Sequence, residues 1–163
     1  MDKEKRVLMM PNVTKGITTA QYRRICESFL AYGCSLCTVA ESADFAGVCL
    51  PVQPEDRLRE CALACVLGGD GSMIHAAHRL LGLGIPLLGI NFGHVGYLAE
   101  LEIGEIDLLD GLANGTYTIE ERMMLAVEVC RDDGTVRSRM YALNDAVLSN
   151  GPIAKLLTFA MRL

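Results

Sequence analysis

The segment Cys61–Ile90, CALACVLGGDGSMIHAAHRLLGLGIPLLGI, contains the pattern that decides the fold. An apolar run, Ala62–Leu67, is followed by the glycine-rich sequence GGDGS at Gly68–Ser72 and then by apolar residues at helical spacing. A short, continuous apolar run is typical of a strand that is buried on both faces of a parallel sheet. The segment therefore predicts a buried strand, a tight loop and a helix that begins at Gly71 or Ser72.

Asp70 is the unusual residue of this loop. Glycines let a ligand approach the main chain closely, and the unpaired N–H groups at the start of a helix attract anions. Because a carboxylate would repel a phosphate placed directly against it, we expect Asp70 to hold a metal ion or to take a proton from a hydroxyl. In isolation, a glycine pair with an aspartate is more often a plain turn with an Asp cap.

A second glycine-spaced segment, GINFGHVGYL at Gly89–Leu98, follows the next apolar run, Ile85–Ile90. In an open α/β sheet, the loops at the carboxyl ends of neighbouring strands line one crevice. We therefore expect the two glycine segments to face a common ligand.

The composition limits the class of protein. The 163 residues suffice for one ordinary domain and a small addition. A net charge of −5 argues against binding to duplex nucleic acid, and 51% hydrophobic residues fit a doubly covered sheet, an oligomer or both. The longest apolar stretch, Leu80–Ile90, is shorter than the roughly 20 residues that cross a membrane, and the N-terminus lacks a secretory pattern. We expect a cytoplasmic protein whose partners are small molecules or protein.

The chain has seven cysteines, which we expect to remain thiols because no export signal is present. The spacing Cys34-x-x-Cys37 followed by Cys61-x-x-x-Cys65 has a superficial likeness to a zinc or redox site. Small buried hydrophobic side chains are the favoured interpretation, since most of these cysteines lie in or beside apolar runs. We assign no metal ligands.

The remaining chain divides into an α/β part and a β-rich part. Before the central segment the pattern predicts a strand at Arg6–Met10, a helix at Thr18–Gly33 that is capped by Thr18 or Thr19, and a second strand at Ser35–Ala40. Residues Glu41–Arg59 are expected to form a loop with a possible brief strand at Val48-Cys49-Leu50. After it the pattern predicts a strand at Ile85–Ile90 and a short helix at Glu105–Ala113. From Thr116 onward it predicts only strands, at Met123–Cys130, Thr135–Leu143, Asp145–Ser149 and Ala154–Leu163.

The last of these strands alternates apolar and other side chains and then stops. A few hairpins cannot cover their own apolar faces, and an unfinished strand edge invites pairing. We expect either that another chain completes this sheet or, as the favoured alternative, that the sequence is part of a longer protein.

Four motifs in order carry a resemblance to a known family. With GGDGS at Gly68–Ser72, GINFGHVGYL at Gly89–Leu98, ERMML at Glu121–Leu125 and ALND at Ala142–Asp145, the sequence resembles the NAD kinases. The resemblance implies a parallel-sheet, Rossmann-like α/β domain at 1–115, followed at 116–163 by the start of a β-sandwich substrate domain that is truncated here. It also implies transfer of the terminal phosphoryl group of ATP to the 2′-hydroxyl of the adenosine ribose of NAD, with Mg²⁺, by a homodimer or homotetramer.

The resemblance also implies roles for individual residues. Asp70 matches the family's catalytic carboxylate, which activates the 2′-hydroxyl. Tyr97 falls where the family usually has Phe beside the bound adenine, which preserves an aromatic platform. The residues matched to nucleotide binding are Gly68, Gly69, Gly71, Ser72, Tyr97, Asn144 and Asp145, and His75 and His94 are possible phosphate contacts.

Two features depart from the family pattern. Asp145 replaces the Glu of the family's Asn-Glu pair and is shorter by one methylene. A further segment, roughly Thr-Pro-Thr-Gly-Ser-Thr-Ala-Tyr, has no counterpart in this chain. We therefore expect the 163-residue chain alone to be weakly active or inactive.

Other interpretations remain open. Phosphofructokinases and the diacylglycerol or sphingosine lipid kinases share a Gly-Gly-Asp-Gly loop, but each needs a further motif that is missing here. A non-catalytic dinucleotide-binding or oligomerisation module is the alternative from another class. His75 and His78 lie three residues apart on the predicted helix, a spacing that can bind a metal, but no third ligand is recognisable and surface histidines are favoured.

Overall fold

The chain folds into two compact units, Met1–Glu121 and Arg122–Leu163. They are seen in a computed structural model that describes residues 5–14, 16–92 and 96–147. Each unit is described by itself.

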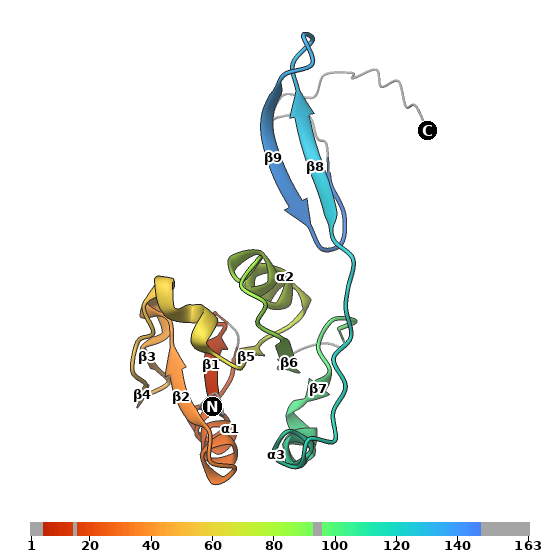
Figure 1. The fold of residues 1–163 in the computed structure, drawn as a ribbon. Helices are drawn as coiled ribbons and strands as arrows, with labels where there is room; N and C mark the ends of the chain where they lie inside the picture. Colours follow the sequence, from red (N-terminus) through yellow and green to blue (C-terminus); the bar gives the residue numbers. More distant parts are fainter. Residues whose placement is uncertain (1–4, 15, 93–95, 148–163) are drawn as a thin grey trace. The chain divides into compact units, whose positions relative to one another are not determined.

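The first unit is built on a five-stranded parallel sheet with the strand order β2-β1-β5-β6-β7 (Figure 1). The strands are β1 (Arg6–Pro11), β2 (Ser35–Thr38), β5 (Leu63–Leu67), β6 (Leu87–Asn91) and β7 (Leu101–Glu102). In the centre, β1 and β5 run in register from Val7 opposite Leu63 to Pro11 opposite Leu67. The predicted α/β class with a parallel sheet is confirmed.

The strand order reverses direction at β1. This strand has β2 on one side and β5 on the other, so the connections that leave β1 and β5 run apart. In open α/β sheets, ligands bind in the crevice at the carboxyl ends of the two strands where the order reverses. Here that crevice is flanked by Asn12, which follows β1, and Gly68, which follows β5.

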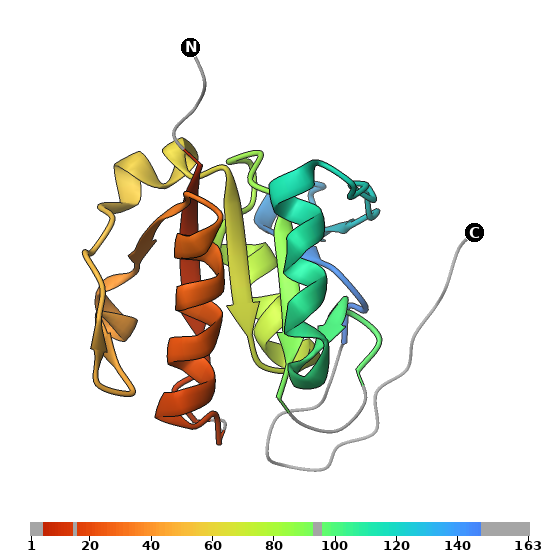
Figure 2. The same cartoon turned by 90° about the horizontal axis from the view of Figure 1, so that it is seen from below.

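Helices cover both faces of the sheet (Figures 1 and 2). One face carries α1 (Thr19–Ala31) together with η3 (Ile103–Leu109) and α3 (Asp110–Asn114), and the other carries α2 (Asp70–Arg79). Helix α1 begins after Thr18, and its buried stripe packs into the core as the helical spacing predicts: Tyr22, Ile25, Cys26 and Phe29.

The structure corrects several predicted boundaries. Helix α2 begins at Asp70 rather than at Gly71 or Ser72, because Gly69 is the extended cap residue and the aspartate already has helical geometry. Strand β2 ends at Thr38, and the short helix η1 (Ala40–Ser42) follows it. In the expected loop after it, the brief strand predicted at Val48-Cys49-Leu50 is confirmed as β4 (Val48–Cys49). The loop also contains its antiparallel partner β3 (Asp44–Phe45) and the helix η2 (Glu55–Glu60). The predicted helix at Glu105–Ala113 is instead η3 followed by α3.

The second unit contains one antiparallel hairpin, formed by β8 (Leu125–Cys130) and β9 (Val136–Ala142). Its turn uses Gly134 at φ 81°, a backbone conformation that side chains disfavour. The predicted strand at Asp145–Ser149 is wrong for residues 145–147, which are not in a strand, and its remainder and the predicted strand Ala154–Leu163 lie outside the described residues. The β-sandwich itself stays a prediction.

Among the described residues, none of the helices combines the length and the apolar character that crossing a bilayer requires.

Candidate functional site

The glycine loop is tightly packed where β5 ends. The N–H of Gly68 donates to the carbonyl of Ile90 at 3.0 Å, which ties the loop to β6. A Cβ at Gly68 would overlap the Ser72 hydroxyl and would lie 2.7 Å from Ser72 Cβ and 3.3 Å from Asn12 Cβ. Only glycine fits between these two side chains. The absence of a side chain at position 68 lets Ser72, in the first turn of α2, pack directly against the loop.

Asp70 lies in the first turn of α2 and is half-buried. Its carboxylate accepts hydrogen bonds from two backbone N–H groups of the second glycine segment. The N–H of Tyr97 lies 3.1 Å from Oδ1 and 3.0 Å from Oδ2, and the N–H of Leu98 lies 3.0 Å from Oδ1. These bonds join the two glycine segments directly and fix the orientation of the carboxylate.

Asn12 connects the loop after β1 to Ser72 at the end of the glycine loop. Its Nδ2 donates to Ser72 Oγ at 2.8 Å, and its Oδ1 accepts from the N–H and the hydroxyl of Thr14 at 3.0 and 2.7 Å. Sequence analysis missed this residue as part of the site. The available signal was its position at the carboxyl end of the first predicted strand.

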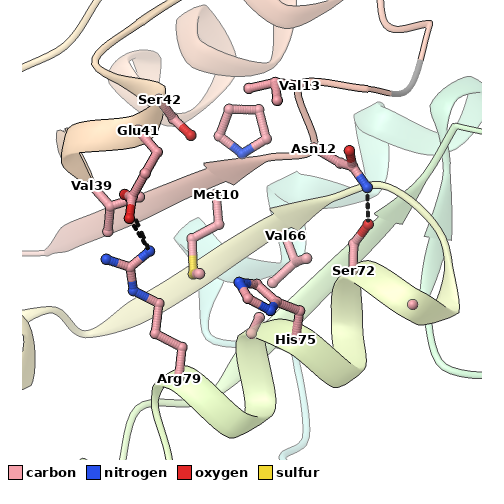
Figure 3. Close-up of a pocket in the computed structure, with 13 residues that line it drawn as sticks. Met10, Asn12, Val13, Val39, Glu41, Ser42, Val66, Ser72, His75 and Arg79 are labelled. Atoms are coloured by element: carbon pink, nitrogen blue, oxygen red, sulfur yellow. Dashed lines mark hydrogen bonds and ion pairs between the residues drawn. The ribbon is translucent and has the colours of Figure 1, made fainter.

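A pocket of about 280 Å³ opens beside these loops, between the segments after β1 and β2 and one face of α2 (Figure 3). Ser72, His75 and Arg79 are spaced three and four residues apart on α2 and all line it. The apolar wall consists of Met10, Pro11, Val13, Val39, Val66 and Ala76.

Two groups of polar side chains lie at opposite ends of the pocket, and His75 lies between them (Figure 3). At one end are Asn12 and Ser72, and at the other Arg79 Nη1 lies 3.2 Å from both carboxylate oxygens of Glu41. Arg79 also pairs with Glu55. The backbone N–H of Glu41 and the guanidinium of Arg79 hold the pKa of the Glu41 carboxyl below its usual value. The charge of Arg79 is therefore compensated by carboxylates within the protein.

The structure places the other predicted site residues as follows. Gly71 lines the pocket, while Gly69 caps α2. The side chain of Tyr97 is 91% exposed although its N–H is bonded to Asp70. His75 is exposed at the pocket, and His94 lies outside the described residues.

Asn144 and Asp145 belong to the second unit. They follow β9 there, and both are exposed within that unit.

Metal-ligating side chains are dispersed in the described part of the chain, which holds no group of three or more His, Cys, Asp or Glu residues suited to a metal ion. All seven cysteines are free thiols. Cys37 and Cys61 are buried with their sulfurs 3.6 Å apart, and Cys34 is half-buried.

Comparison with known proteins gives one consistent family. Residues 49–117 match the model of the ATP-NAD kinase N-terminal domain. The chain is 36% identical over 155 residues to the NAD kinase of Natranaerobius thermophilus, covering 91% of this chain and 52% of that protein. It is 45% identical over 105 residues to the NAD kinase of Nitratidesulfovibrio vulgaris, covering 64% of this chain and 37% of that protein.

Among solved structures, the fold matches a crystal structure of yeast NADH kinase complexed with NADH. The TM-score is 0.71 at 15% sequence identity, and the match covers 86% of this chain and 47% of that one. The likeness shows a shared fold. The chain spans about half the length of that protein and of the N. thermophilus relative, and less of the N. vulgaris relative.

Proposed function

We propose that the chain belongs to the NAD kinase family, whose N-terminal domain model its residues 49–117 match, and that the protein phosphorylates NAD. The reaction moves the terminal phosphoryl group of ATP to the 2′-hydroxyl of the adenosine ribose, which gives NADP. The observation that carries the proposal is the carboxylate of Asp70, held by two backbone N–H groups at the start of α2.

Asp70 has the geometry of a general base for this hydroxyl. An ionised carboxylate offers about four lone-pair sites, and the two N–H groups make three contacts with its two oxygens. Oδ2 receives one of these contacts, so it retains capacity to accept the proton of a ribose hydroxyl. Phosphoryl transfer otherwise asks the protein for positioning and charge stabilisation, which fits a rigidly held loop.

The pocket at the switch point suits the donor. Its volume of about 280 Å³ is close to the lower end of ligand pockets, roughly 300 Å³, and matches one nucleoside moiety better than a whole dinucleotide. We place the phosphates at the Asn12, Gly71 and Ser72 end, where the N-terminus of α2 favours negative charge. The base then lies along the apolar wall.

Asp70 does not line this pocket, although the next residue, Gly71, does. In the proposal, the acceptor ribose therefore approaches the loop from the side of Asp70 and Tyr97, and the donor from the side of Ser72. The exposed Tyr97 ring offers a platform for the adenine of NAD.

Asn144 and Asp145 are proposed to bind the dinucleotide from the β-rich part of the protein. This keeps the division into a nucleotide-binding domain at 1–115 and the start of a substrate domain at 116–163. A homodimer or homotetramer in the cytoplasm also remains part of the proposal.

The residues of the loop suit Mg²⁺ only when the metal is bound together with the phosphates of ATP. Mg²⁺ in kinases is bound by one or two carboxylates, water and substrate phosphates, and the loop supplies a single carboxylate, Asp70. Asp70 does not line the donor pocket and is assigned to the ribose hydroxyl, so the ATP phosphates and water would supply most of the metal's ligands. When bound, the metal would neutralise charge on the phosphates.

The test is Asp70→Asn, assayed for NADP formation from ATP and NAD. We expect a loss of ~10²–10⁴-fold in turnover from a protein that still folds, because a positioned general base contributes about that much. The matched control is Asp110→Asn, since Asp110 is also in the first turn of a helix and is exposed. A near-normal rate for Asp70→Asn would contradict the role. The assay needs a protein that carries the Thr-Pro-Thr-Gly-Ser-Thr-Ala-Tyr segment missing from this chain, because the 163 residues alone are expected to be weakly active or inactive. Binding of ATP and NAD by such a protein in calorimetry without NADP formation would indicate the non-catalytic binding module.

A further inference from the structure

We propose that Gly96 is a positioning residue, which holds the carboxylate of Asp70 in its working orientation by leaving room for it. The inference rests on the proposed function, because it assigns a second residue to the same step. Gly96 immediately precedes Tyr97, whose N–H is one of the two donors to Asp70.

Three hydrogen-bond contacts fix the position of the Asp70 carboxylate. Oδ1 accepts from both Tyr97 and Leu98, and Oδ2 accepts from Tyr97. An aspartate side chain has only two rotatable bonds, so these contacts determine where both oxygens point.

The Asp70 carboxylate occupies the space beside Gly96. A Cβ built there would overlap Asp70 Oδ1 and would lie 3.1 Å from Cγ and 3.6 Å from Oδ2. These three atoms are its nearest neighbours, so Asp70 is the group that a side chain at position 96 would meet first. The carboxylate cannot yield without lengthening its bonds to Tyr97 and Leu98.

The glycines with positive φ in the described residues are Gly33, Gly47, Gly82, Gly84, Gly115 and Gly134. For Gly96, the constraint that the structure shows is the Asp70 carboxylate, which a Cβ at this position would overlap.

The matched control comes from the same stretch of chain. Gly104 is exposed, has no positive φ, and a Cβ there would meet nothing within 4 Å. Gly104→Ala adds the same methyl group without touching the loop. A general effect of losing a glycine should appear in both variants.

The kinetic arm compares Gly96→Ala, Gly104→Ala, Asp70→Ala and the double variant Asp70→Ala/Gly96→Ala. We expect Gly96→Ala to lower kcat by ~10²-fold, the scale of a displacement of about 1 Å in a catalytic site, with the KM for ATP unchanged. Gly104→Ala should match the wild type. Removing Asp70 gives the new methyl group its space, so the double variant should turn over at the rate of Asp70→Ala.

The second arm is independent of turnover. In ¹H–¹⁵N spectra, the amide signals of Tyr97 and Leu98 report their bonds to Asp70. We expect Gly96→Ala to shift both amides toward their positions in Asp70→Ala and to speed their exchange with solvent, while Gly104→Ala leaves them in place. Melting curves for each variant separate this change from general unfolding.

Each outcome bears on the inference. Wild-type-like amide signals in Gly96→Ala would overturn it, as would full kcat in Gly96→Ala when Asp70→Ala is impaired. If the wild-type chain forms no NADP, a result also expected of the 163 residues alone, the amide signals still decide whether Gly96 positions Asp70. Additional loss in the double variant beyond Asp70→Ala would show that Gly96 acts through another group and would also overturn the inference.

Discussion

At the scale of single residues, Asn12 determines how the loops after β1 and β5 meet beside the pocket. One side chain donates to Ser72 and accepts from Thr14, and its own N–H donates to the carbonyl of Leu67 at 2.8 Å. The loops after β1 and β5 are thus joined at the carboxyl end of the sheet. The Asn12 side chain is half-buried. If this side chain is removed, water therefore does not fully replace its hydrogen bonds to Ser72 and Thr14.

We predict that Asn12→Ala lowers the free energy of unfolding by about 1 kcal/mol, the usual net contribution of a hydrogen bond, and raises the KM for ATP more than that for NAD. Urea unfolding and steady-state kinetics measure the two effects. Asn12→Asp is the control variant, because it keeps the acceptor for Thr14 and loses the donor to Ser72. An equal rise of both KM values would argue against a donor-side role.

Sequence reasoning reached Asp70 and the glycine loop because a glycine-rich turn between an apolar run and a helical pattern is a local signal. It missed the structural roles of Asn12 and Gly96. The contact of Asn12 with Ser72 spans 60 positions in the chain, and that of Tyr97 with Asp70 spans 27. The sequence placed the two glycine segments at neighbouring strand ends, but the local pattern does not tell which atoms of distant residues make these contacts.

At the scale of elements, the N-terminus of α1 shows how a cap can be assigned. The Thr18 hydroxyl accepts from the N–H of Gln21 at 3.2 Å, and the Gln21 side chain accepts from the N–H of Thr18 at 2.9 Å. This reciprocal arrangement is a capping box. The sequence left Thr18 and Thr19 open, and the structure assigns the cap to Thr18.

We predict that Thr18→Ala lowers the free energy of unfolding by about 1 kcal/mol, because it removes an acceptor from the first turn of α1. Thr19→Ala is the matched control, since Thr19 is exposed and is the first residue of the helix. Denaturant unfolding of both variants checks the prediction. Equal losses in the two variants would show that the cap contributes nothing specific.

Strand and helix predictions succeeded where the elements are long and buried. Helix α1 and the central strands β1, β5 and β6 have continuous or periodic apolar residues, and all were predicted. Strand β7 has only two residues, Leu101 and Glu102, which is too short for any period to show. The start of α2 was placed late because the backbone angles of Gly69 follow from packing and not from its side chain.

The titrating side chains buried where α1 packs on the sheet make the free energy of unfolding vary with pH in the alkaline range. Burial raises the pKa of Tyr22, and Cys26 raises it further. Burial also raises the pKa of Cys26 to about 11 and that of Cys65, which lies in β5, above its usual value. All three groups stay neutral in the folded protein at pH values where the unfolded chain begins to ionise.

We therefore predict that the free energy of unfolding is level up to about pH 8.5, the ordinary pKa of a thiol, and falls above it. The unfolded chain binds fewer protons than the folded one in that range, so a rise in pH favours unfolding. Urea midpoints from pH 7 to 10.5 measure the slope. Tyr22→Phe removes one ionising group and should flatten the slope above about pH 10. A midpoint that is constant across the range would contradict the prediction.

At the scale of the whole molecule, the two units differ in how well their strands are covered. In the first unit, β1 pairs on both sides and its residues Val7–Pro11 are buried. In the second, nearly every residue of the β8–β9 hairpin is exposed within the described part of that unit, including the apolar residues Leu125, Val129, Val136, Met140 and Tyr141. A two-stranded ribbon without further cover is marginally stable in water.

We predict that hydrogen exchange separates the two units of the 163-residue chain. Amides of β1, β5 and β6 should exchange only through global unfolding, whereas those of β8 and β9 should exchange close to the rate of an unstructured chain despite their paired register. Peptide-resolved mass spectrometry measures both in one experiment, and β5 serves as the internal reference. Protection of β8 and β9 equal to that of β5 would mean that their apolar residues are covered in solution. Sedimentation at several concentrations would then show whether a second copy of the chain provides the cover, because protection by a second copy must decrease on dilution while protection within one chain must not.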